Sequence, residues 1–136
     1  MTDQDELRRM LAALEPPVCA ALTPFTVQEA NLEEGSVILR FEAQPAFSNH
    51  FENVQGGFAA AMLDAVISVA AFAATGRWLP MANLGISFLR PVPIAPCLGQ
   101  ARVLRVGQRM CFVDARLFNA EEVFVTAQAT LANGSA

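Results

Sequence analysis

The stretch QGGFAAAMLDAVISVAAFAATG, residues 55–76, decides the fold of this chain. Asp64 is its only charged residue, so the pattern predicts one long helix, apolar on every face, that opens at Gln55-Gly56-Gly57 and closes at Thr75-Gly76. Residues 58–74 are at the short limit for a membrane span, and Asp64 at the bilayer centre would cost about 2.5–3.5 kcal/mol. We therefore expect no membrane contact and predict a buried helix of a folded domain.

The segments around this helix alternate apolar and polar residues, as half-buried strands do. Strands are expected at residues 25–30, 36–42, 81–92, 99–106, 110–118 and 123–131. Short turns between them favour antiparallel pairing. A short amphipathic helix is expected at residues 3–14, ended by Pro16-Pro17. The layout predicts one α+β domain over residues 1–136, in which a curved antiparallel sheet of about six strands wraps one side of the long helix and another subunit covers the rest.

Composition excludes several classes of protein. The 136 residues are 54% hydrophobic and 16% charged, which excludes intrinsic disorder, and the net charge of −4 argues against a nucleic-acid partner. Three cysteines without CxxC spacing and a single histidine offer neither a disulfide framework nor a metal site. The acidic N-terminus is unlike a signal peptide, so we expect a cytoplasmic protein.

Asp64 is the sharpest chemical signal, because it is the only charge between Glu52 and Arg77. A buried carboxylate is costly unless it is paired or functional, and three explanations remain open: an arginine partner, a helix face that reaches water, or a role in catalysis. Ser68 lies one turn further along the same helical face, where we expect it to pack and to bond back to the helix.

Gly56 and Gly57 are the second signal. Glycines at a helix start let a ligand oxygen approach backbone N–H groups, and the helix terminus favours negative charge, which together suit an oxyanion hole. Close packing is the alternative explanation of the pair. The residues around it match neither GxGxxG nor a phosphate loop ending in GK[ST].

Other polar residues flank these two signals. Asn49 and His50 lie in the loop before the helix. The sequence has no GxSxG nucleophile elbow, whose serine a histidine base would activate. We therefore interpret His50 first as a surface residue. Arg90 has the side chain to bind a phosphate, and the alternative explanation for an arginine there is an ordinary solvent-exposed position. Cys97 is expected to be structural.

The order of these residues resembles the hotdog-fold acyl-CoA thioesterases, in the branch of the phenylacetate-degradation and 4-hydroxybenzoyl-CoA thioesterases. That branch has an asparagine, then His or Gln before Gly-Gly, then an aspartate within the helix, as in Asn49, Gln55-Gly56-Gly57 and Asp64. The segment ISFLRPV at 86–92 is similar to the strand that follows the helix in the family. The resemblance covers about residues 25–131 and implies the hotdog fold.

The resemblance also implies roles. Asp64 would be the general base or nucleophile, Gly56 would donate its N–H to the thioester carbonyl, Gln55 would orient the loop or substrate, and Asn49 would position the water or carbonyl. Candidate substrate-binding residues are Gly57, His50, Met81 and Arg90. Two positions depart from the family pattern: Glu52 replaces a glycine, and a Ser or Thr is missing near Met81 and Ala82. No cofactor or metal is implied.

One carbonyl cannot touch both Gly56 and Asp64 of one chain, because the two lie roughly 12 Å apart along the helix at about 1.5 Å per residue. We therefore expect a composite site in a homodimer or homotetramer that hydrolyses a small or medium acyl- or aryl-CoA. A non-catalytic acyl-CoA-binding domain is the main alternative, favoured by Glu52 and by the missing Ser or Thr. A hotdog dehydratase using His50 is a third.

Overall fold

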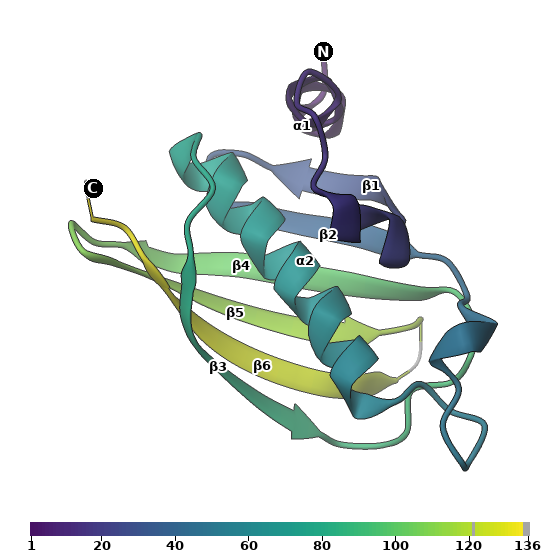
Figure 1. Cartoon of the computed structure of the whole chain (residues 1–136). Coiled ribbons are helices and arrows are strands. Elements are labelled where there is room, and N and C mark those ends of the chain that lie inside the picture. Colours follow the sequence, from purple (N-terminus) through teal and green to yellow (C-terminus); the bar gives the residue numbers. More distant parts are fainter. Residues whose placement is uncertain (121, 135–136) are drawn as a thin grey trace.

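The computed structural model describes residues 1–120 and 122–134. These residues form two α-helices and six strands, with short 3₁₀ turns at Val18–Leu22 and Pro45–Phe47 (Figure 1). In chain order the elements are α1 (Asp3–Ala12), β1 (Phe25–Asn31), β2 (Ser36–Phe41), α2 (Gly56–Thr75), β3 (Met81–Phe88), β4 (Cys97–Val106), β5 (Met110–Phe118) and β6 (Val123–Ala132).

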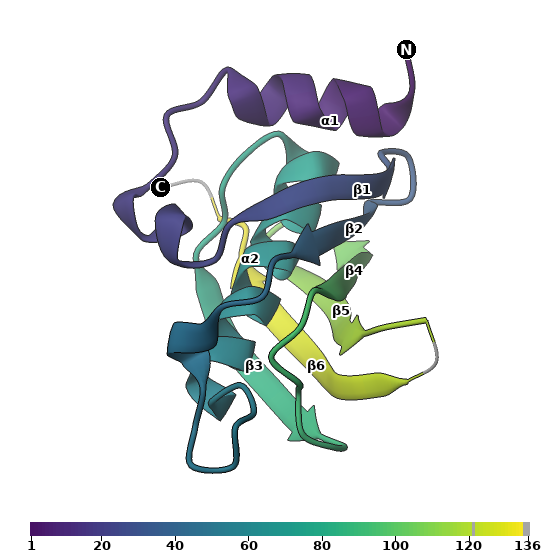
Figure 2. The same cartoon turned by 90° about the vertical axis from the view of Figure 1, so that its right-hand side faces the viewer.

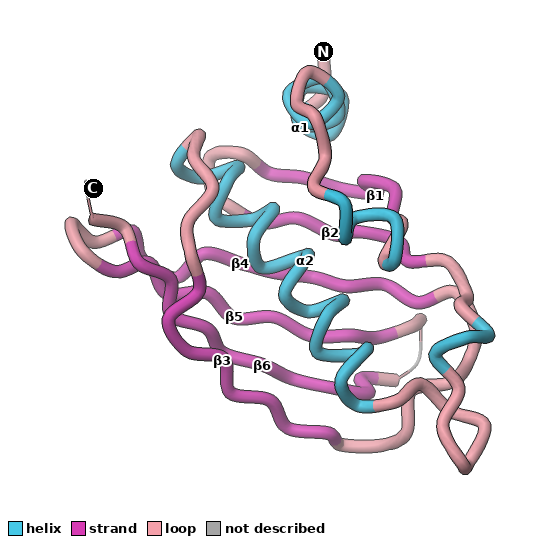
Figure 3. The backbone as a smooth tube through the Cα atoms, viewed as in Figure 1, coloured by secondary structure: helices cyan, strands magenta, loops and turns pink. Residues whose placement is uncertain are grey.

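The strands form one antiparallel sheet in the order β1-β2-β4-β5-β6-β3, which curves around α2 (Figures 1 and 3). The short helix α1 packs along β1 at one edge (Figure 2). At the other edge, β3 pairs with β6 alone. The predicted fold class is confirmed: a long helix, a curved antiparallel sheet of six strands and a short N-terminal helix.

Both ends of α2 lie where the sequence predicts them. Gln55 is the N-cap in an extended conformation, and Gly76 ends the helix with φ +73°, its N–H donating to the Phe72 carbonyl at 2.7 Å. The left-handed conformation explains the glycine, since other residues pay a steric penalty there.

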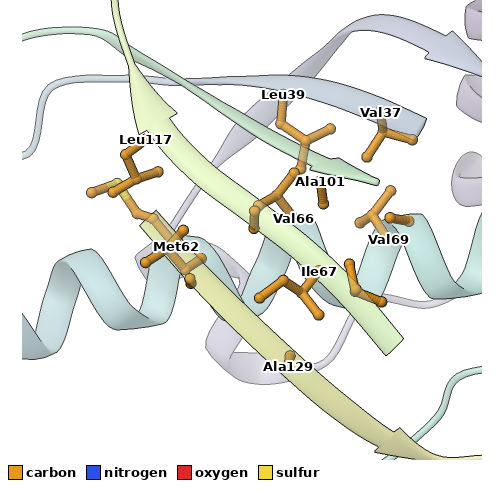
Figure 4. Close-up of a cluster of buried hydrophobic side chains, with 14 of the residues drawn as sticks. Val37, Leu39, Met62, Val66, Ile67, Val69, Ala101, Leu117 and Ala129 are labelled. Carbon is orange, nitrogen blue, oxygen red and sulfur yellow. The ribbon is translucent and has the colours of Figure 1, made fainter. Parts of the chain in front are cut away.

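The core lies between α2 and the inward face of the sheet (Figure 4). Val37 and Leu39 of β2 and Leu117 of β5 meet Val66 and Ile67 of α2, and all five are at most 1% exposed. The alternation expected of half-buried strands is present in β2 and β5, where every second residue is buried.

Within one chain only one face of α2 is buried, which agrees with the prediction that the sheet wraps one side of the helix; the cover of the other side by a second subunit stays a prediction. Nine of its residues are buried on the sheet, whereas Gly57 and Asp64 are exposed and Ala61 and Ser68 are half-buried on the opposite side. A single sheet reaches about half of a helix circumference, so the rest stays open. By length and composition α2 is apolar enough to cross a membrane, but half of its most apolar window is buried within this fold.

Strand ends differ modestly from the expectation. The strand predicted to reach residue 92 ends at Phe88, because the N–H groups of Leu89 and Arg90 both turn to the Phe124 carbonyl and Pro91 has no N–H to continue the ladder. β4 begins at Cys97, two residues before the expected start.

Candidate active site

The N-terminus of α2 presents backbone N–H groups. The Gln55 N–H donates to the Phe47 carbonyl at 2.8 Å, and the Gln55 carbonyl accepts from the N–H groups of Phe58 (2.9 Å) and Ala59 (3.2 Å). Gly56 and Gly57 lie in the first turn of α2, before the first residue whose N–H donates to a carbonyl of the helix. Their N–H groups therefore have no hydrogen-bond acceptor within the helix. The Gln55 side chain is exposed and makes no capping bond. This end of the helix is therefore suited to an oxygen that carries negative charge.

Aromatic rings surround these amides. A Cβ atom built on Gly56 would lie 3.3 Å from Cζ of Phe88, so the Phe88 ring rests against the glycine. Phe58, two residues after Gly56, stacks on Phe47, with ring centroids 4.2 Å apart and planes 2° apart. Because Phe88 remains 53% exposed and Phe58 39%, the amides lie in an apolar setting that is still open to a ligand.

Asn49 organises the loop that leads into α2. Its Oδ1 accepts from the backbone N–H groups of Phe51 (2.9 Å) and Asn53 (3.1 Å), and a bridge between Ser48 and Val54 closes the loop. Those two donors fix which end of the amide is oxygen. Among the described residues Nδ2 of Asn49 has no acceptor, so it remains available to donate to a substrate oxygen.

Glu52, in the loop before α2, has a strained backbone conformation. Glu52 has φ +61°, and among the described residues it is the only non-glycine with a positive φ. A side chain in this left-handed region costs about 1–2 kcal/mol, a penalty that a glycine would avoid. His50 lies in the same turn and is exposed, as a surface residue would be.

Asp64 lies about two turns along α2, on its uncovered face, and is exposed rather than buried in the single chain. Ser68 Oγ donates to Oδ1 of Asp64 at 3.1 Å. No cation pairs with Asp64 within the part of the chain that the structure describes, so the arginine-partner explanation fails there. The expectation for Ser68 was also wrong, because its hydroxyl bonds to the carboxylate and not to the helix backbone.

Ser68 is the site residue that sequence reasoning missed. The signal was available: a hydroxyl four residues after a carboxylate on one helix falls on the same face. Its bond orients the carboxylate toward the open side of α2. Gly56 and Asp64 themselves stay roughly 12 Å apart along the axis.

The structure does not bring Met81 to this site within one chain. Met81 begins β3, opposite Leu131 and half-buried against the core, whereas Phe88 at the other end of β3 is the residue that touches Gly56. The two residues are seven positions apart in β3, a separation of roughly 23 Å at about 3.3 Å per residue.

Arg90 lies just beyond β3, at the end where Phe88 contacts Gly56. It is exposed and ion-pairs with Glu122 at 3.1 Å. The pair holds the guanidinium at the surface, about half exposed, within reach of a ligand in solution.

Known proteins are similar to this chain in sequence and in fold. Residues 51–126, from the strained loop into the start of β6, match the thioesterase superfamily. The crystal structure of a phenylacetic acid degradation-related protein from Ralstonia eutropha JMP134 is 32% identical, with a TM-score of 0.83 over 92% of this chain and 96% of that one. A comparison with curated protein sequences finds no match.

Two more distant structures share the fold. The PaaI protein of the Escherichia coli phenylacetic acid degradation operon is 15% identical, with a TM-score of 0.81 over 96% of this chain and 92% of that one. A Streptococcus mutans UA159 protein bound to acetyl-CoA is 19% identical, with a TM-score of 0.72 over 79% of this chain and 86% of that one.

Proposed function

The chain belongs to the thioesterase superfamily, and on that premise we propose that it hydrolyses small or medium acyl- or aryl-CoA thioesters to the free acid and coenzyme A. One observation carries the proposal: the uncovered face of α2 holds the Asp64 carboxylate, hydrogen-bonded by Ser68, while the helix start offers the N–H of Gly56. A base or nucleophile and an oxyanion donor are the two groups that acyl transfer needs.

The chemistry follows from these groups. The thioester carbonyl oxygen accepts from the Gly56 N–H, and a donor of this kind stabilises the developing oxyanion by about 3–4 kcal/mol. Nδ2 of Asn49 is a second donor. Asp64 either takes a proton from the attacking water or attacks the carbonyl itself to form an anhydride that water then opens. The C–S bond breaks, the CoA sulfur leaves as thiolate and is protonated, and the acid is released.

Two copies of the chain complete this site in the proposal. The separation of Gly56 from Asp64 requires that one carbonyl meet groups from different copies. The uncovered face of α2 and the free edge of β3 support contact there, since an unpaired edge strand invites a partner strand. If β3 pairs antiparallel with β3 of a second copy, Met81 of that copy comes beside Phe88, which gives Met81 a place at the substrate.

Coenzyme A is the partner that this site would take. The Streptococcus mutans structure that shares the fold is bound to acetyl-CoA, which supports a CoA ester as substrate. In this chain Arg90 is a candidate to bind the CoA phosphates. Gln55, Gly57 and His50 lie at the start of α2 or in the loop before it. CoA esters are intracellular metabolites, in keeping with a cytoplasmic enzyme.

Asp64→Asn tests the proposal. The amide keeps the size of the side chain and loses its basicity, so release of CoA thiol from a panel of acyl-CoA esters should fall by about 10²–10⁴-fold while the melting temperature stays unchanged. Glu33→Gln, an exposed acid in the turn between β1 and β2, is the matched control and should keep full turnover. Wild-type turnover in Asp64→Asn would refute the assigned role.

A non-catalytic acyl-CoA-binding domain is the second candidate. Glu52 in a left-handed conformation and Ala82, where a hydroxyl is missing, favour it. It would be supported if calorimetry detects binding of CoA esters while the parent protein releases no thiol from any of them.

A further inference from the structure

The ring of Phe88 contacts the glycine whose N–H is the proposed oxyanion donor. A Cβ atom built on Gly56 would lie 3.3 Å from Cζ of Phe88 and 3.7 and 3.9 Å from its two Cε atoms, so the tip of the ring points at the glycine. Gly56 does not have a positive φ, so its backbone conformation does not require glycine. The close approach of the Phe88 ring does, because any side chain at this position would press on the ring.

The strand end that carries Phe88 is held firmly on one side and open on the other. Phe88 lies directly opposite Val125 of β6, which is fully buried, and side chains of directly opposed residues share one face of a sheet, so Phe88 faces α2. The N–H of the next residue, Leu89, donates to the Phe124 carbonyl at 2.8 Å. Because β3 is at the edge of the sheet, the ring stays 53% exposed beside the start of α2 (Figure 1).

Apolar side chains continue from Phe88 along β3. Ile86 and Leu84 alternate with Phe88 on the same face of the strand, and both are half-buried against the core. Neighbours in this row are about 6.6 Å apart, two residues at about 3.3 Å each. Residues 84–88 include no charged residue. The row therefore forms an apolar path that begins at the Gly56 amide.

A thioester held at Gly56 has to place one of its two arms against this ring. The carbonyl oxygen lies about 2.9 Å from the nitrogen that donates to it, and the carbonyl carbon about 1.2 Å further. The atoms bonded to that carbon therefore come beside the Phe88 ring. One arm leads to coenzyme A, whose charged nucleotide has to stay in water, so the acyl arm is the one that suits an apolar path.

We propose that Phe88 is a specificity-determining residue, because its ring forms the wall on which the acyl group packs next to the reacting carbonyl. This inference rests on the proposed hydrolysis of CoA thioesters and narrows it to uncharged, apolar acyl groups larger than acetyl. In the two-copy arrangement described above, Met81 of the second copy lies beside Phe88 and supplies a second apolar wall.

The preference follows from the size of the acyl group. Acetyl has a single methyl group beyond the carbonyl, whereas hexanoyl has a chain of five carbons that can cover the ring and extend toward Ile86. Each CH₂ group that the wall removes from water in the transition state raises kcat/KM by about fourfold. Two such groups in contact with the ring therefore favour hexanoyl-CoA over acetyl-CoA by more than tenfold.

Phe88→Ala tests the assignment through a ratio of rates. Release of CoA thiol gives kcat/KM for hexanoyl-CoA and for acetyl-CoA, and the hexanoyl-to-acetyl ratio should fall by about tenfold or more when the ring is removed. Both rates come from the same sample, so the ratio does not depend on the folded fraction. Phe112→Ala is the matched control: it removes a 40% exposed ring from β5, where buried Cys111 and Val113 place it on the other face of the sheet, and should keep the wild-type ratio.

Phe88→Leu guards against misfolding of the alanine variant. Leucine keeps an apolar side chain at the strand end, and its ratio should fall between those of the wild type and Phe88→Ala. Circular dichroism and melting temperature establish that each variant is folded.

The outcomes separate this inference from the proposed function. A wild-type ratio in folded Phe88→Ala, or equal losses with both esters, would overturn the role of Phe88 and leave thioester hydrolysis standing. A wild-type protein that releases no thiol from either ester would overturn the proposed function, and the inference with it.

Discussion

The Ser68→Ala variant distinguishes an effect on catalysis at the uncovered face of α2 from an effect on the stability of the fold. Ser68 Oγ donates to Oδ1 of Asp64 at 3.1 Å, and a hydrogen bond to a charged group contributes about 1.5–3 kcal/mol. The bond lowers the barrier only by as much as it is stronger in the transition state than in the free enzyme; a difference of about 1.5–3 kcal/mol would make its loss lower kcat by roughly 10- to 150-fold, at about 1.4 kcal/mol per factor of ten. Stability should hardly change, because Ser68 is half-buried and alanine has the higher helix propensity by about 0.5 kcal/mol.

The assay is release of CoA thiol, with urea unfolding measured on the same samples. Thr75→Ala is the matched control: it removes a hydroxyl from the same helix, one that donates to the Ala71 carbonyl at 2.7 Å, and should keep full turnover. Ser68→Thr keeps the donor and should retain most activity. Turnover of Ser68→Ala equal to that of the wild type, or a loss of activity matched by a loss of stability, would refute the reasoning.

Three further predictions concern packing and titration. Gly99→Ala places a Cβ 2.8 Å from a buried phenylalanine ring, so urea unfolding should show a loss of about 1–3 kcal/mol. Asn133→Ala removes a side chain, 8% exposed, that accepts from Arg77 and donates to a backbone carbonyl at 2.6 Å, which should cost about 2–4 kcal/mol by the same measurement. Burial raises the pKa of the Cys97 thiol from 9.0 to about 11, so the free energy of unfolding should fall as the pH rises through that interval, and exposed Cys19 should react first with a thiol reagent.

Local sequence signals predicted most of the fold. The ends of α2 followed from Gly56 and Gly76, since glycine at a helix start and in a left-handed cap has a direct backbone cause. The inward residues of β2 and β5 followed from strict alternation. The end of β3 did not, because it depends on which carbonyl the Leu89 N–H reaches, and Phe124 is distant in sequence.

The site was predicted less completely than the fold. Asp64 was identified from its isolation in an apolar helix, but its exposure depends on which face the sheet covers, and a helix apolar all round carries no sign of that face. Glu52 was noted only through family resemblance, and its positive φ gives the physical reason for glycine there. Ser68 was undervalued because serine within a helix usually bonds to the backbone.

The exposure of Asp64 bears directly on how the site must be assembled. An aspartate open to water on an isolated chain is surrounded by competing solvent, and a carbonyl held at Gly56 is out of its reach on the same helix. Covering the open face of α2 with a second copy would remove both obstacles at once, because it would exclude water from the carboxylate and bring the other copy's helix start toward it. Activity and association should therefore be lost together on dilution, which single-chain catalysis would not show.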